Sequence, residues 1–568
     1  MSLLPVSILA AILTGISAAT SMSLLLLMLF GPLTMAISAF SLCAGTAAGF
    51  FVYVTCRGYG YERPRLTFFD FLMIFFFVLF CFRQFLWIYF HKNGAIYTQH
   101  PQSLGDLPAH IQFIRYFARG ATFWPENPIF VGEKFYYTFG MDLFSALFVN
   151  LGIPIEIVLP ITGFTLGLTT LLALLHWGRG FTVGGLLFAG GVAGFSWMVT
   201  GTLNDYHAGV PLPWNAVMLL MIPQRALLFG LPCGLLLLWS WRRRFVMFNS
   251  VGLPAWLEGC LWGFFPIFHI HTFLFLSILF AIWVTATRRF KEGWSVLRWA
   301  LIPATLEVVM LTNFFEKKSL FWFKWGWIID DQNPFLFFMT HFGFFVFLAL
   351  FAIYHVMAPE KKEHRLLVYP GLAFFGACFY VVVTPWIFDN VKIMIWGYLL
   401  LLPVMGEALE ERVRWPWRVG AYFLLFFSGF LTLFSEHVPT YPGIGIATDK
   451  EIDGVCHATK DLPVSSRFAT VQTYNHPVAM CGQPLVAGFG GHLSGYKIDA
   501  AAVQENLHRL MRGDPEWRAL SVSLQARYLF WGIREQGEYP KSTRPWENAA
   551  VRIAEGEWGA IYDLGLPP

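Results

Sequence analysis

Long apolar runs recur along most of the first 435 residues, and they constrain the fold more than any other feature of the sequence. A helix needs roughly 20 apolar residues to cross a bilayer, and fewer where it breaks or re-enters. On this basis the sequence predicts about thirteen membrane spans, at residues 4–20, 22–41, 67–91, 155–176, 180–200, 214–241, 254–269, 270–287, 296–313, 335–356, 367–385, 392–408 and 417–435. We therefore expect a mostly α, polytopic bundle of transmembrane helices, with the divisions inside 3–55 and 254–287 left open.

The composition fits a chain embedded in lipid. Hydrophobic residues make up 56% of it and charged residues only 13%, whereas a soluble domain carries about 25% charged residues. The net charge of +4 is small and is not gathered into a basic stripe, which argues against nucleic acid as a partner. This composition therefore predicts that membrane lipid surrounds most of the chain.

Clusters of lysine and arginine between the spans predict the orientation, because such clusters concentrate in cytoplasmic loops. They are Arg57/Arg63/Arg65, Arg242–Arg244, Arg288/Arg289/Lys291, Lys361/Lys362/Arg365 and Arg412/Arg414/Arg418. With the spans above, all of them fall on one side, which we take as cytoplasmic. The odd span count then predicts a multi-pass protein of the cell (inner) membrane whose residues 436–568 are extracytoplasmic. Lys317, Lys318 and Lys324 fall on the outer side and break the rule, either as interfacial anchors or as a clamp for a lipid phosphate.

Residues 436–568 predict a soluble domain that is separate from the transmembrane domain of residues 1–435. The stretches RFATVQTY and ARYLFWGIRE are typical of strands, whereas AAVQENLHRLMRG predicts a helix that ends at Gly513. This mixture indicates a small α/β domain. Cys456 and Cys481 lie within it and either form a disulfide, if the domain is outside the cytoplasm, or stay as two buried thiols.

The long outer loop at residues 92–154 contains a predicted amphipathic helix. Apolar residues at helical spacing in GDLPAHIQFIRYFAR are Leu107, Ile111, Ile114 and Ala118. We expect residues 105–119 to lie as a helix on the outer membrane surface, and a second such segment near 139–152. Asp106 and His110 are four residues apart and therefore share a face of this helix. Asp106 either caps the helix or is a functional carboxylate, and the two roles are compatible.

Ionisable residues inside spans are costly and are functional candidates by default. With the predicted topology they gather in the outer leaflet and at its surface, and they are Arg83, Arg225, His269, His271, Asp389 and Lys392. Arg225 needs an anion or several carbonyl groups there. His269 and His271 are two residues apart and would point apart on one helix, so the sequence does not indicate a metal site there. Asp389 and Lys392 are also compatible with a simple salt bridge. In the soluble domain, the glycine-rich stretch GFGGHLSGYKIDA is either a structural loop or a site that includes His492.

Several stretches together resemble a known family of membrane enzymes. GDLPAHIQFIRYFARG followed by FWPENPIFVGEKFYYTFG is similar to the first large outer loop of GT-C fold glycosyltransferases. MIPQRALLFGLP, GFFPIFHIHTFLFL, PWIFDNVKIMIW and VAGFGGHLSGYKID with RYLFWGIRE resemble a poorly characterised bacterial branch of multi-span proteins. The resemblance implies a GT-C-like bundle that moves a sugar from a polyprenyl phosphate to a glycan, lipid or protein acceptor at the outer face.

The resemblance also implies roles for individual residues. Asp106 resembles the catalytic base, and His110 would orient the acceptor or contact the donor phosphate. Arg225 and Lys392 would bind the lipid phosphate as charge grows on the leaving oxygen. Many family members carry two adjacent acidic residues in this loop, whereas Asp106 has no acidic neighbour, so Glu126 and Glu133 are candidate partners. No metal or other cofactor is indicated.

A transporter or flippase for a lipid or glycan, with an extracytoplasmic binding domain, is the alternative function. A non-catalytic scaffold is a third. Transport predicts pseudo-repeats and broken helices at the midplane of the membrane. The sequence has no evident repeat and its polar residues are predicted on the outer side, which favours the enzyme.

Overall fold

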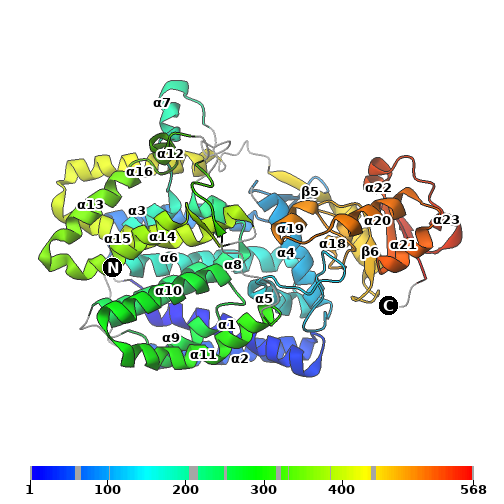
Figure 1. The fold of residues 1–568 in the computed structure, drawn as a ribbon, viewed down its shortest axis with the longest axis horizontal. Helices are drawn as coiled ribbons and strands as arrows, with labels where there is room; N and C mark the ends of the chain where they lie inside the picture. Colours follow the sequence, from blue (N-terminus) through cyan, green and yellow to red (C-terminus); the bar gives the residue numbers. More distant parts are fainter. Residues whose placement is uncertain are drawn as a thin grey trace. The chain divides into compact units, whose positions relative to one another are not determined.

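The computed structural model of the chain describes residues 3–57, 65–101, 103–203, 215–247, 252–314, 322–329, 332–383, 386–435 and 443–565. Its contacts divide the chain into two compact units, and Figure 1 labels the helices and strands. Unit 1 comprises Met1–Ala18, Gly45–Leu86 and Ile161–Pro442, and unit 2 comprises Ala19–Ala44, Trp87–Pro160 and Gly443–Pro568. The outer loop and the C-terminal residues therefore belong to the same unit.

Unit 1 is built from helices. Three of the long ones are shared with unit 2, namely α1 (Val6–Phe30), α2 (Met35–Arg57) and α6 (Ile155–Leu187). The others are α3 (Phe68–Leu86), α8 (Arg225–Trp241), α10 (Ile270–Thr287), α11 (Phe290–Leu311), α13 (Phe345–Met357), α14 (Arg365–Ala377), α15 (Val391–Arg412) and α16 (Trp415–Ser435). Shorter elements are η1 (Ala193–Ser196), α7 (Trp197–Thr200), η2 (Val217–Met221), η3 (Arg242–Val246), α9 (Ala255–Gly263), α12 (Pro334–Phe342), η4 (Pro359–His364) and η5 (Ile387–Asn390). Strands β3 (Trp322–Phe323) and β4 (Val381–Val382) form one antiparallel pair. The predicted mostly α, polytopic class is confirmed.

The described helices include eight that are long and apolar enough to cross a membrane, or nine if α12 and α13, bent by 92° at their junction, count as one span. This is fewer than the about thirteen that the apolar runs predicted. The predicted spans 214–241, 254–269 and 367–385 correspond to α8, α9 and α14, whose helical lengths are 17, 9 and 13 residues. Because the parity of the spans fixed the predicted location of the C-terminal residues, that location stays a prediction.

Helix α6 merges two predicted spans, but its backbone breaks where they were expected to separate. Gly178 and Arg179 have non-helical dihedral angles, with φ of 61° at Arg179. The Asp70 carboxylate accepts a hydrogen bond from the Gly180 N–H, the first donor beyond the break, at 2.7 Å. It also accepts one from Arg179 Nη2 at 2.7 Å. The break is therefore held by one buried carboxylate.

Helix α15 is the buried centre of unit 1, where it packs against α10, α13 and α14. Gly397 lets α14 approach closely, because an added Cβ there would lie 2.6 Å from the Phe375 nitrogen and 2.8 Å from the Gly371 oxygen. Lys392 lies in the first turn of α15. Its backbone is consequently fixed by one of the most tightly packed helices of the unit.

Four of the five predicted basic clusters meet at one end of unit 1, which we call the basic end. Arg179, Arg242 and Glu410 line a common cavity there. The contacts that join the clusters are Arg179 Nη2 to the Arg65 oxygen at 2.9 Å, Arg242 Nη2 to His364 Nε2 at 3.5 Å, and Lys361 Nζ to Glu411 Oε1 at 2.6 Å. These four clusters thus share one end of unit 1, as expected if Lys and Arg concentrate in the loops on one side of the membrane.

Unit 2 combines two small sheets with helices. The first sheet has the antiparallel order β1-β2-β5, from β1 (Phe90–Lys92), β2 (Ala95–Thr98) and β5 (Ile444–Thr448). The second has the order β6-β7-β9-β8, from β6 (Arg467–Ala469), β7 (Ala526–Gly532), β9 (Gly559–Asp563) and β8 (Val551–Gly556), in which only β6 and β7 are parallel. The helices are α4 (Ser103–Ala118), α5 (Gly140–Asn150), α17 (Asp449–Thr459), α18 (Pro477–Met480), α19 (Gly490–Gly495), α20 (Ala501–Arg512), α21 (Trp517–Ser523), α22 (Ile533–Glu538) and α23 (Trp546–Ala549). Strand β5 joins the C-terminal residues to the hairpin of the outer loop.

The local predictions for the C-terminal residues agree with the structure. Strand β7 is buried along almost its whole length. Helix α20 ends at Arg512, and Gly513 terminates it with a left-handed φ of 76°, a conformation that glycine adopts without steric cost. Cys456 and Cys481 form a disulfide that joins α17 to the residue after α18, so the alternative of two free thiols is wrong.

Candidate functional site

Helix α4 carries the candidate base and is enclosed by protein. It begins at Ser103, and residues on all its faces are buried. The side chain of Gln112, on the face expected to be wet, donates hydrogen bonds to the Pro128 and Gln483 oxygens at 3.1 Å each. The predicted helix is therefore present, but its amphipathic face toward water is not observed, because protein buries residues on every face; its location at the outer membrane surface stays a prediction. Its polar residues are satisfied by the rest of unit 2.

His110 and Asp142 form a buried pair between α4 and α5. His110 Nδ1 lies 2.9 Å from Asp142 Oδ2 and 3.1 Å from Oδ1, and the two residues are 3% and 1% exposed. A carboxylate only accepts hydrogen bonds, so Nδ1 carries the hydrogen and a neutral His110 keeps its lone pair on Nε2. This is the arrangement in which a carboxylate orients an imidazole and fixes its tautomer.

Asp106 and His492 complete the polar cluster at the start of α4. Asp106 lies in the first turn, three residues after the helix begins, so it does not occupy the capping position. The charges of Asp106 and His110 both act on His492, which also hydrogen-bonds the backbone of Gly105. Burial lowers the pKa of His492 from its ordinary value, and the nearby Asp106 carboxylate opposes that shift only in part. His492 is therefore neutral near pH 7 and is able to accept as well as donate a hydrogen bond.

We call Asp106, His110, Asp142 and His492 the α4 cluster. Its walls are aromatic, since the Tyr137 ring lies 6.1 Å from that of His110 and 5.7 Å from that of Tyr496. The cluster brings together three residues predicted from the sequence and adds Asp142. Only the position of Asp142 in the second predicted helical segment of the loop could have drawn attention to it, because its partner is 32 positions earlier.

The two other acidic candidates of the loop lie in the segment 126–134. The Glu126 carboxylate pairs with Arg467 at 2.9 Å, in a contact that also ties β6 to the loop. The backbone oxygen of Glu133 accepts a hydrogen bond from the Asn127 nitrogen at 2.8 Å, and its side chain is half-buried.

Unit 2 also contains a cavity of about 650 Å³ beside the C-terminal half of α4. Tyr116 and Trp124 provide aromatic surface, and Glu126, Lys134 and Arg527 provide charges. Such a mixture is typical of a site that binds a polar ligand with flat apolar faces. Tyr116 follows Asp106 by ten residues on α4, which corresponds to about 15 Å along the helix.

In unit 1 the structure brings four predicted residues together. Lys392 Nζ pairs with Asp389 Oδ2 at 2.9 Å, which confirms the salt bridge. His269 and His271 both lie within electrostatic range of Lys392, with their rings 5.4 Å apart. His269 caps α10, since its Nδ1 accepts a hydrogen bond from the Thr272 nitrogen at 3.2 Å. This assigns His269 at least a structural role.

The remaining predicted residues of unit 1 are placed individually. Arg225 is the first residue of α8 and is 2% exposed. Arg83 lies half-buried in the last turn of α3, and Lys324 is exposed directly after β3. Lys317 and Lys318 are outside the described residues.

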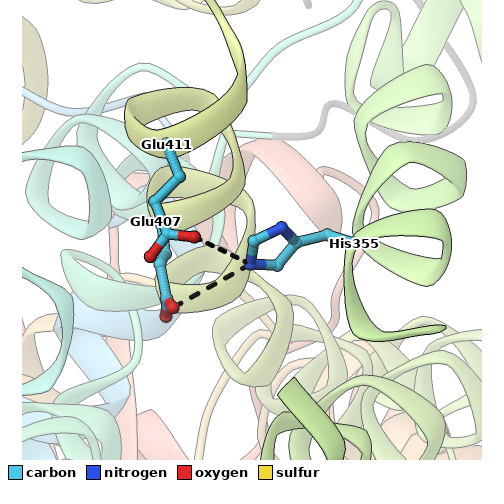
Figure 2. A group of neighbouring side chains, drawn as sticks. All are labelled: His355, Glu407 and Glu411. Atoms are coloured by element: carbon cyan, nitrogen blue, oxygen red, sulfur yellow. Dashed lines mark ion pairs between the residues drawn. The ribbon is translucent and has the colours of Figure 1, made fainter. Parts of the chain in front are cut away.

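A separate group of His355, Glu407 and Glu411 has ligand atoms close enough to hold a metal ion (Figure 2). His355 Nε2 lies 3.9 Å and 4.0 Å from the two carboxylates. However, Lys361 Nζ already contacts both carboxylates, at 2.5 and 2.6 Å. Arg412 Nε donates to His355 Nδ1 at 2.8 Å, so a neutral His355 carries its hydrogen on Nε2 and has no lone pair there for a metal. The residues present fit an ion-pair network better than a metal site.

Comparison with known proteins gives matches among solved structures. The chain is similar to the oligosaccharyltransferase of Archaeoglobus fulgidus in its apo form, with a TM-score of 0.41, 9% identity, and coverage of 83% of this chain and 71% of that one. It is also similar to the same organism's AglB in complex with an inhibitory peptide and a dolichol-phosphate, with a TM-score of 0.39, 10% identity, and coverage of 83% and 70%. No family model and no curated protein matches. No fold, activity or residue role is transferred to this chain from either of these two structures.

Proposed function

We propose that this chain is a membrane glycosyltransferase that moves a sugar from a polyprenyl-phosphate donor to an acceptor at the outer face of the membrane. The observation that carries the proposal is the α4 cluster. It combines a half-buried carboxylate, an imidazole oriented by a second carboxylate, and a neutral histidine, on a helix whose position is fixed by packing. These are the groups that general acid–base chemistry requires.

In the proposed reaction an acceptor hydroxyl attacks the anomeric carbon of the donor sugar. The bond between that carbon and the phosphate oxygen breaks, and the polyprenyl phosphate leaves with both electrons. The proton of the hydroxyl passes to Asp106, or to Nε2 of His110. Asp142 acts as a positioning residue, because it holds the His110 ring through Nδ1 at 2.9 Å.

The donor phosphate needs positive charge where the leaving oxygen becomes negative. We assign that role to Arg225 and Lys392, with Arg83, His269, His271 and Asp389 supporting the donor and Lys324 contacting lipid. Arg225, which is 2% exposed and begins α8, would offer that phosphate a positive charge on a backbone fixed by the helix. The pairing of Lys392 with Asp389 would hold its ammonium group in place.

For the acceptor we assign the cavity beside α4. A glycan or a polypeptide presents flat apolar faces and polar groups, which match its aromatic and charged lining. The distance of about 15 Å along α4 between Tyr116 and Asp106 suits an extended acceptor. His492 and Glu133 are further acceptor contacts in this proposal.

The extracytoplasmic location of the C-terminal residues is part of the proposal and is supported by the Cys456–Cys481 disulfide, since such bonds persist in oxidising compartments. An alkaline phosphatase fused after Phe434 should be active, and one fused after Arg244 should be inactive. The reverse pattern would invert the topology and remove the outer-face reaction.

The test of the catalytic proposal is the Asp106→Asn variant in a glycan-transfer assay with purified protein. The amide keeps the size of the side chain but accepts protons poorly, so the rate should fall by about 10²–10⁴ while expression and insertion are unchanged. Asp449→Asn is the matched control, because Asp449 pairs with His91 and belongs neither to the α4 cluster nor to the acceptor cavity, and it should retain activity. An active Asp106→Asn enzyme would contradict the role of Asp106 as base. If the protein is a transporter, the wild type itself should show no glycan transfer, and the variants should not differ from it in this assay.

A further inference from the structure

A second polar cavity lies at the basic end of unit 1 and has no part in the proposed reaction. Its volume is about 600 Å³, which is within the range of small-ligand sites. It is walled by α3, the break in α6, the end of α8 with η3, and α15. It differs from an ordinary membrane-surface cluster of arginines because these side chains line one common cavity.

The carboxylates in the cavity wall are already neutralised, apart from one at the surface. Asp70 is bound by Arg179, by the Gly180 N–H and by Thr67. Glu407 pairs with Lys361 at 2.5 Å and with His364 Nε2 at 3.1 Å. Glu410 is exposed, so its charge is screened by solvent.

Arg242 and Arg243 also line the cavity, and each guanidinium group lies close to a tryptophan ring. The guanidinium of Arg242 lies 5.6 Å from the Trp177 ring, and that of Arg243 lies 5.2 Å from the Trp239 ring. Trp177 is itself fixed, because its Nε1 donates to the Leu399 oxygen at 2.8 Å. The rings hold the planar guanidinium groups in defined orientations without neutralising them.

Arg242 lacks an adequate acceptor among the described residues. Its Nε is buried and has no hydrogen-bond partner in the described part of the chain. Its Nη2 lies 3.5 Å from His364 Nε2, but that nitrogen also faces the Glu407 carboxylate at 3.1 Å. A nitrogen that donates to a carboxylate cannot accept from a guanidinium at the same time. Arg242 therefore presents unsatisfied donors to the cavity.

We propose that this cavity binds the phosphate group of an anionic membrane phospholipid, with Arg242 as its main ligand and Arg243 as a second. Oxygen atoms of a phosphate match the fork of a guanidinium and would satisfy the buried donor. The apolar wall, which includes Trp239 and Met247, suits the glycerol and the first methylene groups of a lipid. With the predicted orientation the site faces the cytoplasmic leaflet, where anionic lipids attract basic segments.

The experiment uses the full-length protein, delipidated in a neutral detergent, and follows its melting temperature as phosphatidylglycerol, diacylglycerol or sodium phosphate is added. Phosphatidylglycerol should stabilise the wild type in a saturable way, and the other two should not. Arg242→Gln should weaken the apparent affinity for phosphatidylglycerol by roughly tenfold to a hundredfold. An equal effect of diacylglycerol would refute the phosphate contact, and an equal effect of sodium phosphate would refute the lipid.

Arg289→Gln is the matched control. Arg289 belongs to another basic cluster and pairs with Glu292 at 2.5 Å, and it does not line the cavity, so its loss should leave phosphatidylglycerol binding unchanged. If both variants weaken binding equally, the arginines are general interfacial anchors and the proposal fails. Arg242→Lys keeps the charge without the fork and should bind with intermediate affinity. If Arg242→Gln does not fold, wild-type binding by Arg242→Lys refutes the proposal.

Discussion

Asp142→Asn tests whether the buried pair with His110 serves catalysis or only the fold. In the native protein Asp142 accepts the Nδ1 hydrogen of His110 at 2.9 Å. The asparagine amide can instead donate to Nδ1, which moves the ring hydrogen to Nε2 and removes the lone pair that faces the cluster. If His110 takes part in proton transfer or holds the acceptor through Nε2, the rate of glycan transfer should fall by about 10²–10⁴.

The same substitution has a predictable effect on stability. Both residues are almost fully buried, and a hydrogen bond to a charged group contributes about 1.5–3 kcal/mol. The melting temperature should therefore fall by a few degrees, which is too little to explain a hundredfold loss of rate. Both quantities are measured on one purified sample, by differential scanning fluorimetry and by the transfer assay.

Asp449→Asn is the control, because unit 2 contains a second histidine–aspartate pair that is partly exposed. His91 Nδ1 lies 2.7 Å from Asp449 Oδ1, with side chains 49% and 26% exposed. Exposed pairs contribute about 0–1 kcal/mol, so this variant should behave as wild type in both measurements. If Asp142→Asn keeps the wild-type rate and only melts earlier, the pair is structural and Asp106 is left as the base without help from His110.

Three further predictions concern the stability of unit 2. Burial alone would raise the pKa of Glu535, but His476 and two backbone N–H groups outweigh burial and lower that pKa. The carboxylate should therefore stabilise the fold above about pH 4.5, and this contribution should be lost as the pH falls further. Glu535→Gln should accordingly flatten the acid limb of a plot of melting temperature against pH. Replacing Cys456 and Cys481 by serine should cost about 2–5 kcal/mol, and free thiols in protein isolated without reductant would contradict the pairing. Gly513→Ala should lower the melting temperature, because a Cβ would lie 2.3 Å from Thr543 Oγ1 at a φ of 76°, and an unchanged temperature would show that the chain relaxes there.

The apolar runs predicted membrane-spanning helices well where one helix fills one run. The predicted span 270–287 is α10, with the same ends. The span 180–200 failed, since the helix ends at Leu187. Beyond it, residues 188–192 form no regular element before η1 and α7, and a Cβ at Gly191 would lie 1.5 Å from the Thr340 oxygen, so the backbone there packs directly against another segment. Hydropathy cannot distinguish such a segment from a helix, because both are apolar.

The α4 cluster shows a second limit of the same kind. Apolar spacing predicted the helix around Asp106 and His110, but an apolar stripe looks the same whether lipid or protein covers it. The polar residues of the helix distinguish the two cases. His110 and Gln112 would contact water on a surface helix, but both are buried and form hydrogen bonds within the protein. Their partners come from α5, from Pro128 in the outer loop and from Gln483 among the C-terminal residues, and only tertiary structure brings these to α4. A buried histidine in such a helix therefore requires a partner elsewhere in the chain, and in this protein that partner is the carboxylate that gives His110 a defined tautomer.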